Sequence, residues 1–381
     1  MRFQRVLILI LIGWYLILIL GHYFNQRPLW NDEICVLNSI NNLKPAELFT
    51  RPLLSNQEFP RLYLWIIQQF SKPFDHSLLS LRIFSMLAML GAFFVWLNVA
   101  GRALSHTWDF ILFIGCWCAS MPLVYYAAEL KPYSMDVLIS GLIVLFLIHQ
   151  DEMKKNHQNY RVILFLFPLL GLLSYPAIFL LLLPLYNLVR DCADEHRLKS
   201  GGACRCLPAL SCFLFSYILM LGLVCIFDFR VSVSHQLQVY FWHDYFISFH
   251  SLKDFLNSFG KGMNNLIARR FAESPRWIKG PSRIFIGLGL GYMFLAFGRQ
   301  FKKDHFALRS VITIALALFL MQLLLAIGWV YPLGVPRMSL FYSPLLLLMA
   351  DKRQVRVKDK GKIPSWFFMH RRPLAFWGNQ W

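Results

Sequence analysis

Charged residues are scarce in this sequence. Asp, Glu, Lys and Arg make up 15% of its 381 residues, against about 25% in soluble globular proteins. Acidic residues are the scarcer sign, at 20 against 38 basic ones. The hydrophobic content of 57% and the mean hydropathy of +0.50 exceed what a soluble core needs. The composition therefore excludes an ordinary soluble protein and predicts an all-α membrane protein, a bundle of about ten transmembrane helices.

Several other signals are missing. No Gly-rich phosphate loop follows a strand-like segment, so no nucleotide-binding fold is predicted. There is no internal repeat and no low-complexity linker. The formal net charge of +18 falls between and beside the apolar runs, where it sets orientation and meets anionic lipid headgroups. We therefore expect membrane lipids as partners and no nucleic acid.

The apolar runs predict the individual spans, although several are shorter than the ~20 residues that a span usually needs. Around Tyr175-Pro176 two interpretations stay open, either a turn between two spans or a kink in one. The predicted spans are residues 6–20, 78–99, 108–126, 133–149, 161–173, 177–189, 208–227, 283–298, 310–329 and 338–350.

Basic residues predict the orientation of the bundle. No small-residue cleavage site follows the first apolar run, so we expect an uncleaved first helix with its N-terminus in the cytoplasm. Every inner loop is then basic, as the positive-inside rule requires. The predicted protein is a multi-pass protein of the cell inner (plasma) membrane, with a domain over residues 1–350 and a basic, aromatic cytoplasmic tail over 351–381. The inner loops are residues 100–107, 150–160, 190–207 and 299–309.

Two outer segments, residues about 21–77 and 228–282, are longer than simple connectors. The first contains a short amphipathic stretch over residues 58–70, where Pro60 can start a helix. It is too short to span, so we interpret it as an interfacial helix. Elsewhere, Cys192, Cys204 and Cys206, with His196 nearby, suggest a metal site only superficially. Their spacing fits no zinc pattern, and ordinary loop cysteines are favoured.

The outer segments contain the residues that could carry chemistry. Asp32 and Glu33 follow the first span, and adjacent carboxylates can bind a divalent cation or take a proton from a hydroxyl. A solvated turn that caps a helix is the simpler explanation of this pair alone. Cations lie at the outer ends of separate spans, where they can bind a phosphate or simply reach toward lipid headgroups. These cations are Arg82, Lys131 and Arg337.

A series of short motifs occurs in a fixed order. The motifs are Asp32-Glu33, Pro60-Arg61-Leu62-Tyr63, Leu81-Arg82-x-x-Ser85, Glu129-Leu130-Lys131-Pro132-Tyr133-Ser134 and Tyr331-Pro332-Leu333-Gly334-x-x-Arg337. Their order and shared sidedness resemble the bacterial GT-C glycosyltransferases, in the protein-mannosyltransferase-like group that includes lipid A aminoarabinose transferases. The resemblance covers about residues 1–350.

This resemblance implies an enzyme that takes a sugar from a polyprenyl-phosphate donor and transfers it to an outer-face hydroxyl of a lipid, glycan or protein. Asp32 would be the general base, or would orient the acceptor and a divalent cation, and Glu33 would assist. Lys131 and Arg337 would hold the donor phosphate, with Arg82 a lesser candidate. Pocket residues would be Glu129, Tyr133 and Tyr331. The chain departs from larger members in lacking a sizeable C-terminal soluble domain, and many relatives have arginine at the position of Lys131.

Two other functions fit part of the same pattern. A lipid or oligosaccharide transporter of the cell envelope would line a path with charges. Asp136, just inside the fourth predicted span, is the main residue that favours it. A non-enzymatic membrane scaffold would not require the Asp32-Glu33 pair.

Overall fold

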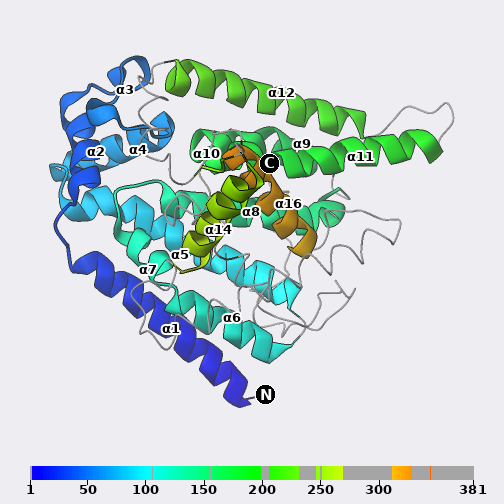
Figure 1. Cartoon of the computed structure of the whole chain (residues 1–381), viewed down its shortest axis with the longest axis horizontal. Coiled ribbons are helices and arrows are strands. Elements are labelled where there is room, and N and C mark those ends of the chain that lie inside the picture. The colour runs from blue at the N-terminus through cyan, green and yellow to red at the C-terminus, as the bar shows by residue number, and fades with distance from the viewer. Residues whose placement is uncertain are drawn as a thin grey trace, which may run out of the picture.

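The structure is a computed structural model. It describes residues 2–104, 106–154, 157–198, 206–230, 246–248, 251–268, 311–327 and 344. These residues form helices and connecting turns, and no strand occurs among them. Helices from distant parts of the sequence lie side by side, as α1 (Arg2–Phe24) and α6 (Thr107–Ala119) do in Figure 1. The described part of the chain is therefore an all-α bundle.

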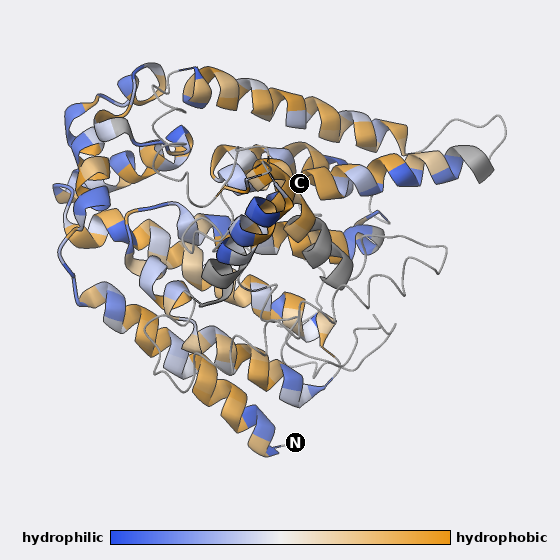
Figure 2. Cartoon of the chain, in the orientation of Figure 1, coloured by the Kyte–Doolittle hydropathy of each residue, from blue (hydrophilic) through white to orange (hydrophobic). Residues whose placement is uncertain are grey.

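Within the described ranges, 5 helices are long and apolar enough to cross a membrane, or 6 if one bent pair counts as a single span. Their shafts are strongly hydrophobic in Figure 2, most clearly α1 and α12. Many of their large apolar side chains face outward, including Leu9, Trp14 and Ile17 of α1, as expected of helices solvated by lipid. The 5 candidates are Arg2–Phe24, Leu78–Ala103, Tyr133–Gln150, Tyr175–Glu195 and Leu207–Phe229.

The third and fifth predicted spans are less regular than the others. Residues 108–126 form α6 and a short α7 (Met121–Tyr125), which meet at Ser120 in a bend of 63°. Pro122 stands at the start of α7, and proline cannot continue the hydrogen-bond ladder of a preceding helix. Residues 161–173 form only a short apolar helix, built from α9 (His157–Leu166) and η4 (Phe167–Leu172).

The remaining predicted spans are described to different extents. After η4 the chain forms α10 (Tyr175–Leu180) and α11 (Leu182–Leu198). These two helices make up one candidate span, Tyr175–Glu195. Of the last three, α16 (Val311–Ile327) lies within 310–329. Residues 283–298, nearly all of 338–350 and the tail 351–381 lie outside the described residues. The total of about ten spans thus stays a prediction.

The segment between the first two spans folds into short helices at one end of the bundle (Figure 1). The amphipathic stretch that starts at Pro60 is helical, as its pattern predicted, and it buries Tyr63, Leu64 and Ile67. Its position relative to a membrane stays a prediction. The segment contains α2 (Asn31–Asn42), α3 (Glu47–Thr50), η1 (Leu54–Asn56), α4 (Arg61–Ser71) and η2 (Lys72–Phe74).

A buried hydrogen bond ties this segment to a distant span. The Arg61 guanidinium donates to the carbonyl oxygens of Leu48 and Arg51, at 2.9 and 3.0 Å. The backbone N–H of Arg61 donates to Asp228 Oδ1 at 3.2 Å. Asp228 lies in a π-helical turn (Cys225–Phe229) that ends α12 (Leu207–Val224). Asp228 thus caps the N-terminus of α4 and fixes α4 against the end of α12.

The centre of the bundle is the contact between α5 (Leu78–Ala103) and α8 (Tyr133–Met153). The indole N–H of Trp96 donates to the carbonyl oxygen of Val137 at 3.0 Å. Gly141 makes this approach feasible, because a Cβ there would lie 2.7 Å from Trp96 Nε1. Small residues serve the same purpose where helices pack closely in membranes. This contact fixes α8 against α5, and therefore fixes the turn that precedes α8.

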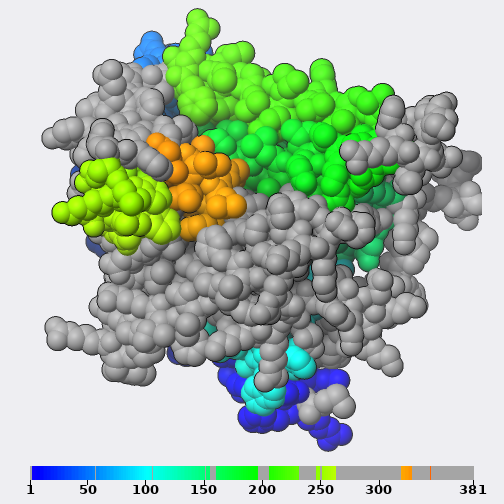
Figure 3. All heavy atoms as spheres, turned by 45° about the vertical axis from the view of Figure 1, so that its right-hand side comes forward, coloured from blue at the N-terminus to red at the C-terminus, as the bar shows by residue number. Residues whose placement is uncertain are grey.

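Two further helices pack together in front of this centre. They are the strongly amphipathic α14 (Leu252–Ala268) and α16, which lie side by side in Figure 3. Phe255 and Phe259 of α14 pack with Leu323 and Ala326 of α16. Residues 251–268 belong to the second outer segment of the predicted topology, so α14 is a second short helix in a predicted outer segment.

Candidate active site

The polar end of the bundle, where α2, α3 and α4 lie, is more hydrophilic than the shafts of α1 and α12 (Figure 2). A set of charged side chains from the turn before α2, from α2 and α5, and from the segment before α8 meets there. We call this set the charged cluster. Its members are Arg27, Asp32, Glu33, Arg82, Glu129 and Lys131.

Glu33 is the central anchor of the charged cluster and is fully buried. Its Oε1 accepts from Arg82 Nε at 3.1 Å and from the backbone N–H of Leu130 at 2.8 Å. Its Oε2 accepts from Arg82 Nη2 at 2.8 Å and from the backbone N–H of Trp30 at 3.3 Å, and it lies 3.5 Å from Arg27 Nη1. Each carboxylate oxygen is thus saturated. We therefore expect Glu33 to position the site, where the sequence suggested a part in catalysis.

The guanidinium of Arg82 is likewise fully hydrogen-bonded to protein groups. Its Nε and Nη2 form a bidentate pair with Glu33, and its Nη1 donates to the carbonyl oxygen of Arg27 at 2.6 Å. The side chain is only 2% exposed. Every nitrogen of the guanidinium is therefore engaged, and binding a donor phosphate would require breaking the pair with Glu33. We revise the prediction for Arg82 from a phosphate ligand to a positioning residue.

Asp32 points away from Glu33, because successive side chains on a helix diverge by about 100°. Its Oδ2 lies 3.6 Å from Lys131 Nζ, and its side chain is 27% exposed. Lys131 is nearly buried, donates to Gln57 Oε1 at 3.1 Å and lies over the ring of Phe59 at 4.7 Å. A carboxylate within reach of solvent thus stands beside a lysine held in place by its surroundings.

Glu129 lies beside this pair and is fully buried. Its Oε1 accepts from the indole N–H of Trp30 at 3.2 Å, whereas its Oε2 has no hydrogen-bond partner. Burial and the neighbouring Glu33 together raise the pKa of Glu129 to about 7, although Lys131 and Arg27 oppose the shift. With Glu129 protonated, the charged cluster has one positive charge in excess. That balance favours an anionic ligand.

The shifted pKa of Glu129 predicts how stability depends on pH. A folded pKa of about 7, above the ordinary glutamate value of 4.5, means that the folded state prefers the protonated acid. Stability from this group is present below pH 4.5 and is lost as the pH rises toward 7. Relative to Glu129→Gln, the wild-type protein should lose roughly 1–3 kcal/mol over this interval. Thermal unfolding in detergent at several pH values measures the difference, and parallel curves for the two proteins would contradict it.

The other predicted site residues stand as follows. Tyr133 begins α8 and packs against Tyr126, with ring centroids 5.1 Å apart. Tyr331 and Arg337 lie outside the described residues, so their roles stay predictions. In the described ranges, no three His, Cys, Asp or Glu side chains are grouped so that they could hold a metal ion. A divalent cation at Asp32 therefore also stays a prediction.

Sequence reasoning did not select Arg27, Trp30 or Gln57 as site residues. An arginine just outside the first span runs against the positive-inside trend, and Arg27 could have been noticed for that reason. Trp30 and Gln57 gave no comparable signal, because their roles depend on contacts with residues 129 and 131. Such contacts are set by the packing of distant segments.

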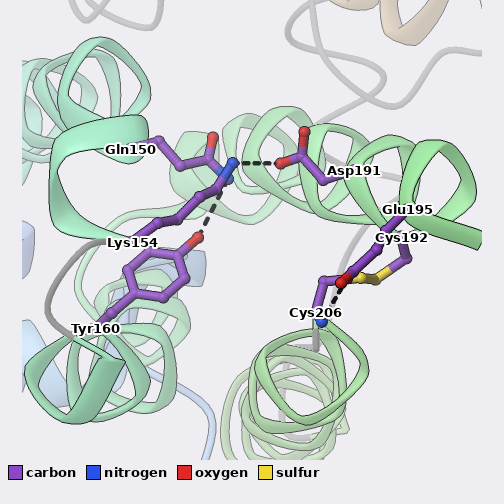
Figure 4. The surroundings of a disulfide bond; sticks show 7 residues. All are labelled: Gln150, Lys154, Tyr160, Asp191, Cys192, Glu195 and Cys206. Carbon is purple, nitrogen blue, oxygen red and sulfur yellow. Dashed lines mark hydrogen bonds and ion pairs between the residues drawn. A yellow bond between two sulfur atoms is a disulfide. The ribbon is translucent and has the colours of Figure 1, made fainter. Parts of the chain in front are cut away.

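A second polar group lies at the far ends of α8 and α11 (Figure 4). Lys154 pairs with Asp191, and Gln150 donates to the Tyr160 hydroxyl at 3.3 Å. Nearby, Cys192 and Cys206 form a disulfide, with Cα atoms 5.4 Å apart. The favoured interpretation of both as ordinary loop cysteines was therefore wrong. Cys192 lies in α11 and Cys206 precedes α12, so the fold brings together thiols that the sequence placed in one loop.

Comparison with known proteins identifies no relative of this chain. No family model, no curated protein and no solved structure matches the chain. The resemblance to GT-C glycosyltransferases rests on the motifs alone.

Proposed function

We propose that the chain is an integral-membrane glycosyltransferase that moves a hexosyl or pentosyl group from a polyprenyl-phosphate donor to a hydroxyl outside the cytoplasm. The acceptor would be a lipid, a glycan or a protein. The observation that supports this most directly is the pair formed by Asp32 and Lys131, whose charged atoms lie 3.6 Å apart. One can take a proton and the other can stabilise an anion.

The reaction needs little more than such a pair. The bond between the sugar and the phosphate is already activated, so the enzyme must align the acceptor oxygen and remove its proton. In the proposal, Asp32 accepts the proton as the new carbon–oxygen bond forms. The bond to phosphate breaks with its electrons on the phosphate, where Lys131 and Arg337 stabilise the charge. Glu33 and Arg82 hold the surrounding backbone in place.

The proposal includes the predicted orientation. Both termini lie in the cytoplasm, the basic loops and tail face the inner leaflet of the cell inner membrane, and the charged cluster faces outward. The basic residues of each predicted inner loop support this arrangement.

Mass spectrometry of glycolipids and cell-envelope glycans, with and without the protein, tests the proposal. A glycosyltransferase adds a hexose or pentose mass to an acceptor, and that product should be missing from cells without the protein. Identical glycolipids and glycans in both cell types would contradict it.

The transporter remains the second candidate because of Asp136. This carboxylate lies in the first turn of α8 and is nearly buried, and it accepts from the Ser174 hydroxyl at 2.6 Å. Buried acids in spans often mark transport pathways. A transporter would move its substrate across the membrane without changing its mass, so an assay of sugar transfer by the purified protein in proteoliposomes separates the two functions.

Lys131 provides a direct test of the donor site. Lys131→Gln should weaken binding of a short-chain isoprenyl phosphate roughly tenfold to hundredfold, because a charge-assisted contact is lost. Lys131→Arg should retain most of the affinity. Titration of the purified protein in detergent measures both. The control is Lys72→Gln, which changes an exposed lysine at the end of α4, and equal losses at positions 72 and 131 would remove Lys131 from the site.

A further inference from the structure

Trp30 is an exposed aromatic side chain that is fixed at two points. The residue is 36% exposed. Its indole N–H donates to Glu129 at 3.2 Å, and its backbone N–H donates to Glu33 at 3.3 Å. Both acceptors are fully buried carboxylates. The ring is therefore held in one orientation before any ligand arrives.

Trp30 and Glu129 lie directly beside the Asp32–Lys131 pair. Residues 30 and 32 stand at the start of α2, and residues 129 and 131 stand just before α8. Contacts of 3.2 and 3.6 Å join 30 to 129 and 32 to 131. The two segments thus run along each other with two successive cross-links, one aromatic and one ionic.

The direction of the indole N–H distinguishes a ligand platform from a lipid anchor. A tryptophan that anchors a protein in the bilayer interface directs its N–H toward headgroups and water. The N–H of Trp30 is directed instead at a buried carboxylate of the protein. In addition, Glu129 Oε2 is buried and has no hydrogen-bond partner, so this oxygen can still form a hydrogen bond with a ligand.

A sugar ring has the chemistry that such a pair recognises. One face of the ring presents C–H groups that pack on an aromatic face, and its rim presents hydroxyls that donate to carboxylates. We propose that Trp30 and Glu129 form the subsite for the sugar of the donor, with the ring packed on the indole and one hydroxyl hydrogen-bonded to Glu129 Oε2. This inference rests on the proposed function. It assigns the sugar to residues 30 and 129 and leaves the phosphate to Lys131.

Two probes separate the sugar subsite from the phosphate site. One is a set of short-chain isoprenyl phosphates that bear a hexose or a pentose, and the other is the same isoprenyl phosphate without sugar. Trp30→Leu should weaken binding of the preferred sugar-bearing probe roughly threefold to tenfold and leave the sugar-free probe unchanged. Trp30→Phe, which keeps a ring, should lose less. Glu129→Leu should act as Trp30→Leu does, whereas Glu129→Gln still accepts from the indole and should keep more affinity.

The matched control is Trp65→Leu, because Trp65 is also 36% exposed but lies on α4, outside the charged cluster. Trp65→Leu should change the affinity for neither probe. If Trp30→Leu weakens binding of both probes equally, Trp30 is a structural residue or a membrane anchor and the inference is overturned. If Trp30→Leu changes binding of neither probe, the inference is overturned as well. If the wild-type protein binds neither probe, the proposed function fails as well. A wild-type protein that binds both probes with the same affinity would overturn the sugar subsite alone.

Discussion

Replacing Asp32 by Asn is expected to lower sugar transfer roughly 10²–10⁴-fold, the range typical of a lost general base. The amide keeps the shape of the side chain but cannot accept the proton of the acceptor hydroxyl. Asp32 is 27% exposed and lies at the solvent side of the charged cluster, beside Lys131, so the variant should remain folded and inserted in the membrane. Cells that produce Asp32→Asn should lack the glycosylated product that wild-type cells contain, as measured by mass spectrometry.

Asp75→Asn is the matched control for this variant. Asp75 is exposed in the turn after η2, where its φ is 48°, a conformation that Asn adopts readily. Transfer by this control should equal that of the wild-type protein. Full transfer by Asp32→Asn, at equal protein levels, would exclude Asp32 as the base.

Replacing Glu33 by Gln is expected to destabilise the protein by about 3–5 kcal/mol, as other broken buried ion pairs do. The new amide group would face donors that now bind the carboxylate, including Arg82 Nη2 and the backbone N–H of Trp30. Arg82 would then be left as a buried charge without its partner. Thermal unfolding in detergent, followed by circular dichroism, should show the loss as a large fall in melting temperature.

Glu47→Gln gives the comparison for Glu33. Glu47 pairs with the exposed Arg51 one helical turn away, and such surface pairs contribute little. Its replacement should leave the melting temperature nearly unchanged. A variant with both Glu33→Met and Arg82→Met should recover part of the stability, because no buried charge remains unpaired. A Glu33→Gln variant as stable as Glu47→Gln would show that Glu33 is not an anchor.

The helices that sequence predicts best are those in which composition alone decides the structure. The helices α1, α5, α8 and α12 follow long apolar runs, because only a helix satisfies its own backbone in lipid. The break at Ser120 was missed, although Pro122 was a visible signal. Residues 161–173 were predicted either as a span or as part of one kinked segment with 177–189, and they form part of a short apolar helix over 160–172.

The sequence predicts which residues belong to the candidate site better than it predicts what each of them does. Asp32, Glu33, Arg82, Glu129 and Lys131 do lie together. Sequence could not assign opposite directions to Asp32 and Glu33, because that choice depends on how α2 is rotated against α5. Nor could it reveal that Arg82 is engaged by Glu33, or that Cys192 lies next to Cys206. Each of these facts is set by tertiary packing.

Labelling of single cysteines tests the central claim, that the charged cluster and Arg337 belong to one site on the outer face. Asp32→Cys, Arg337→Cys and Arg102→Cys would each be made in a chain whose native cysteines are Ser, and whole cells would be treated with a membrane-impermeant maleimide. We expect labelling at 32 and 337 in intact cells, and at 102 only after permeabilisation. If 32 and 337 label from opposite sides of the membrane, they cannot belong to one site and the proposed mechanism is wrong.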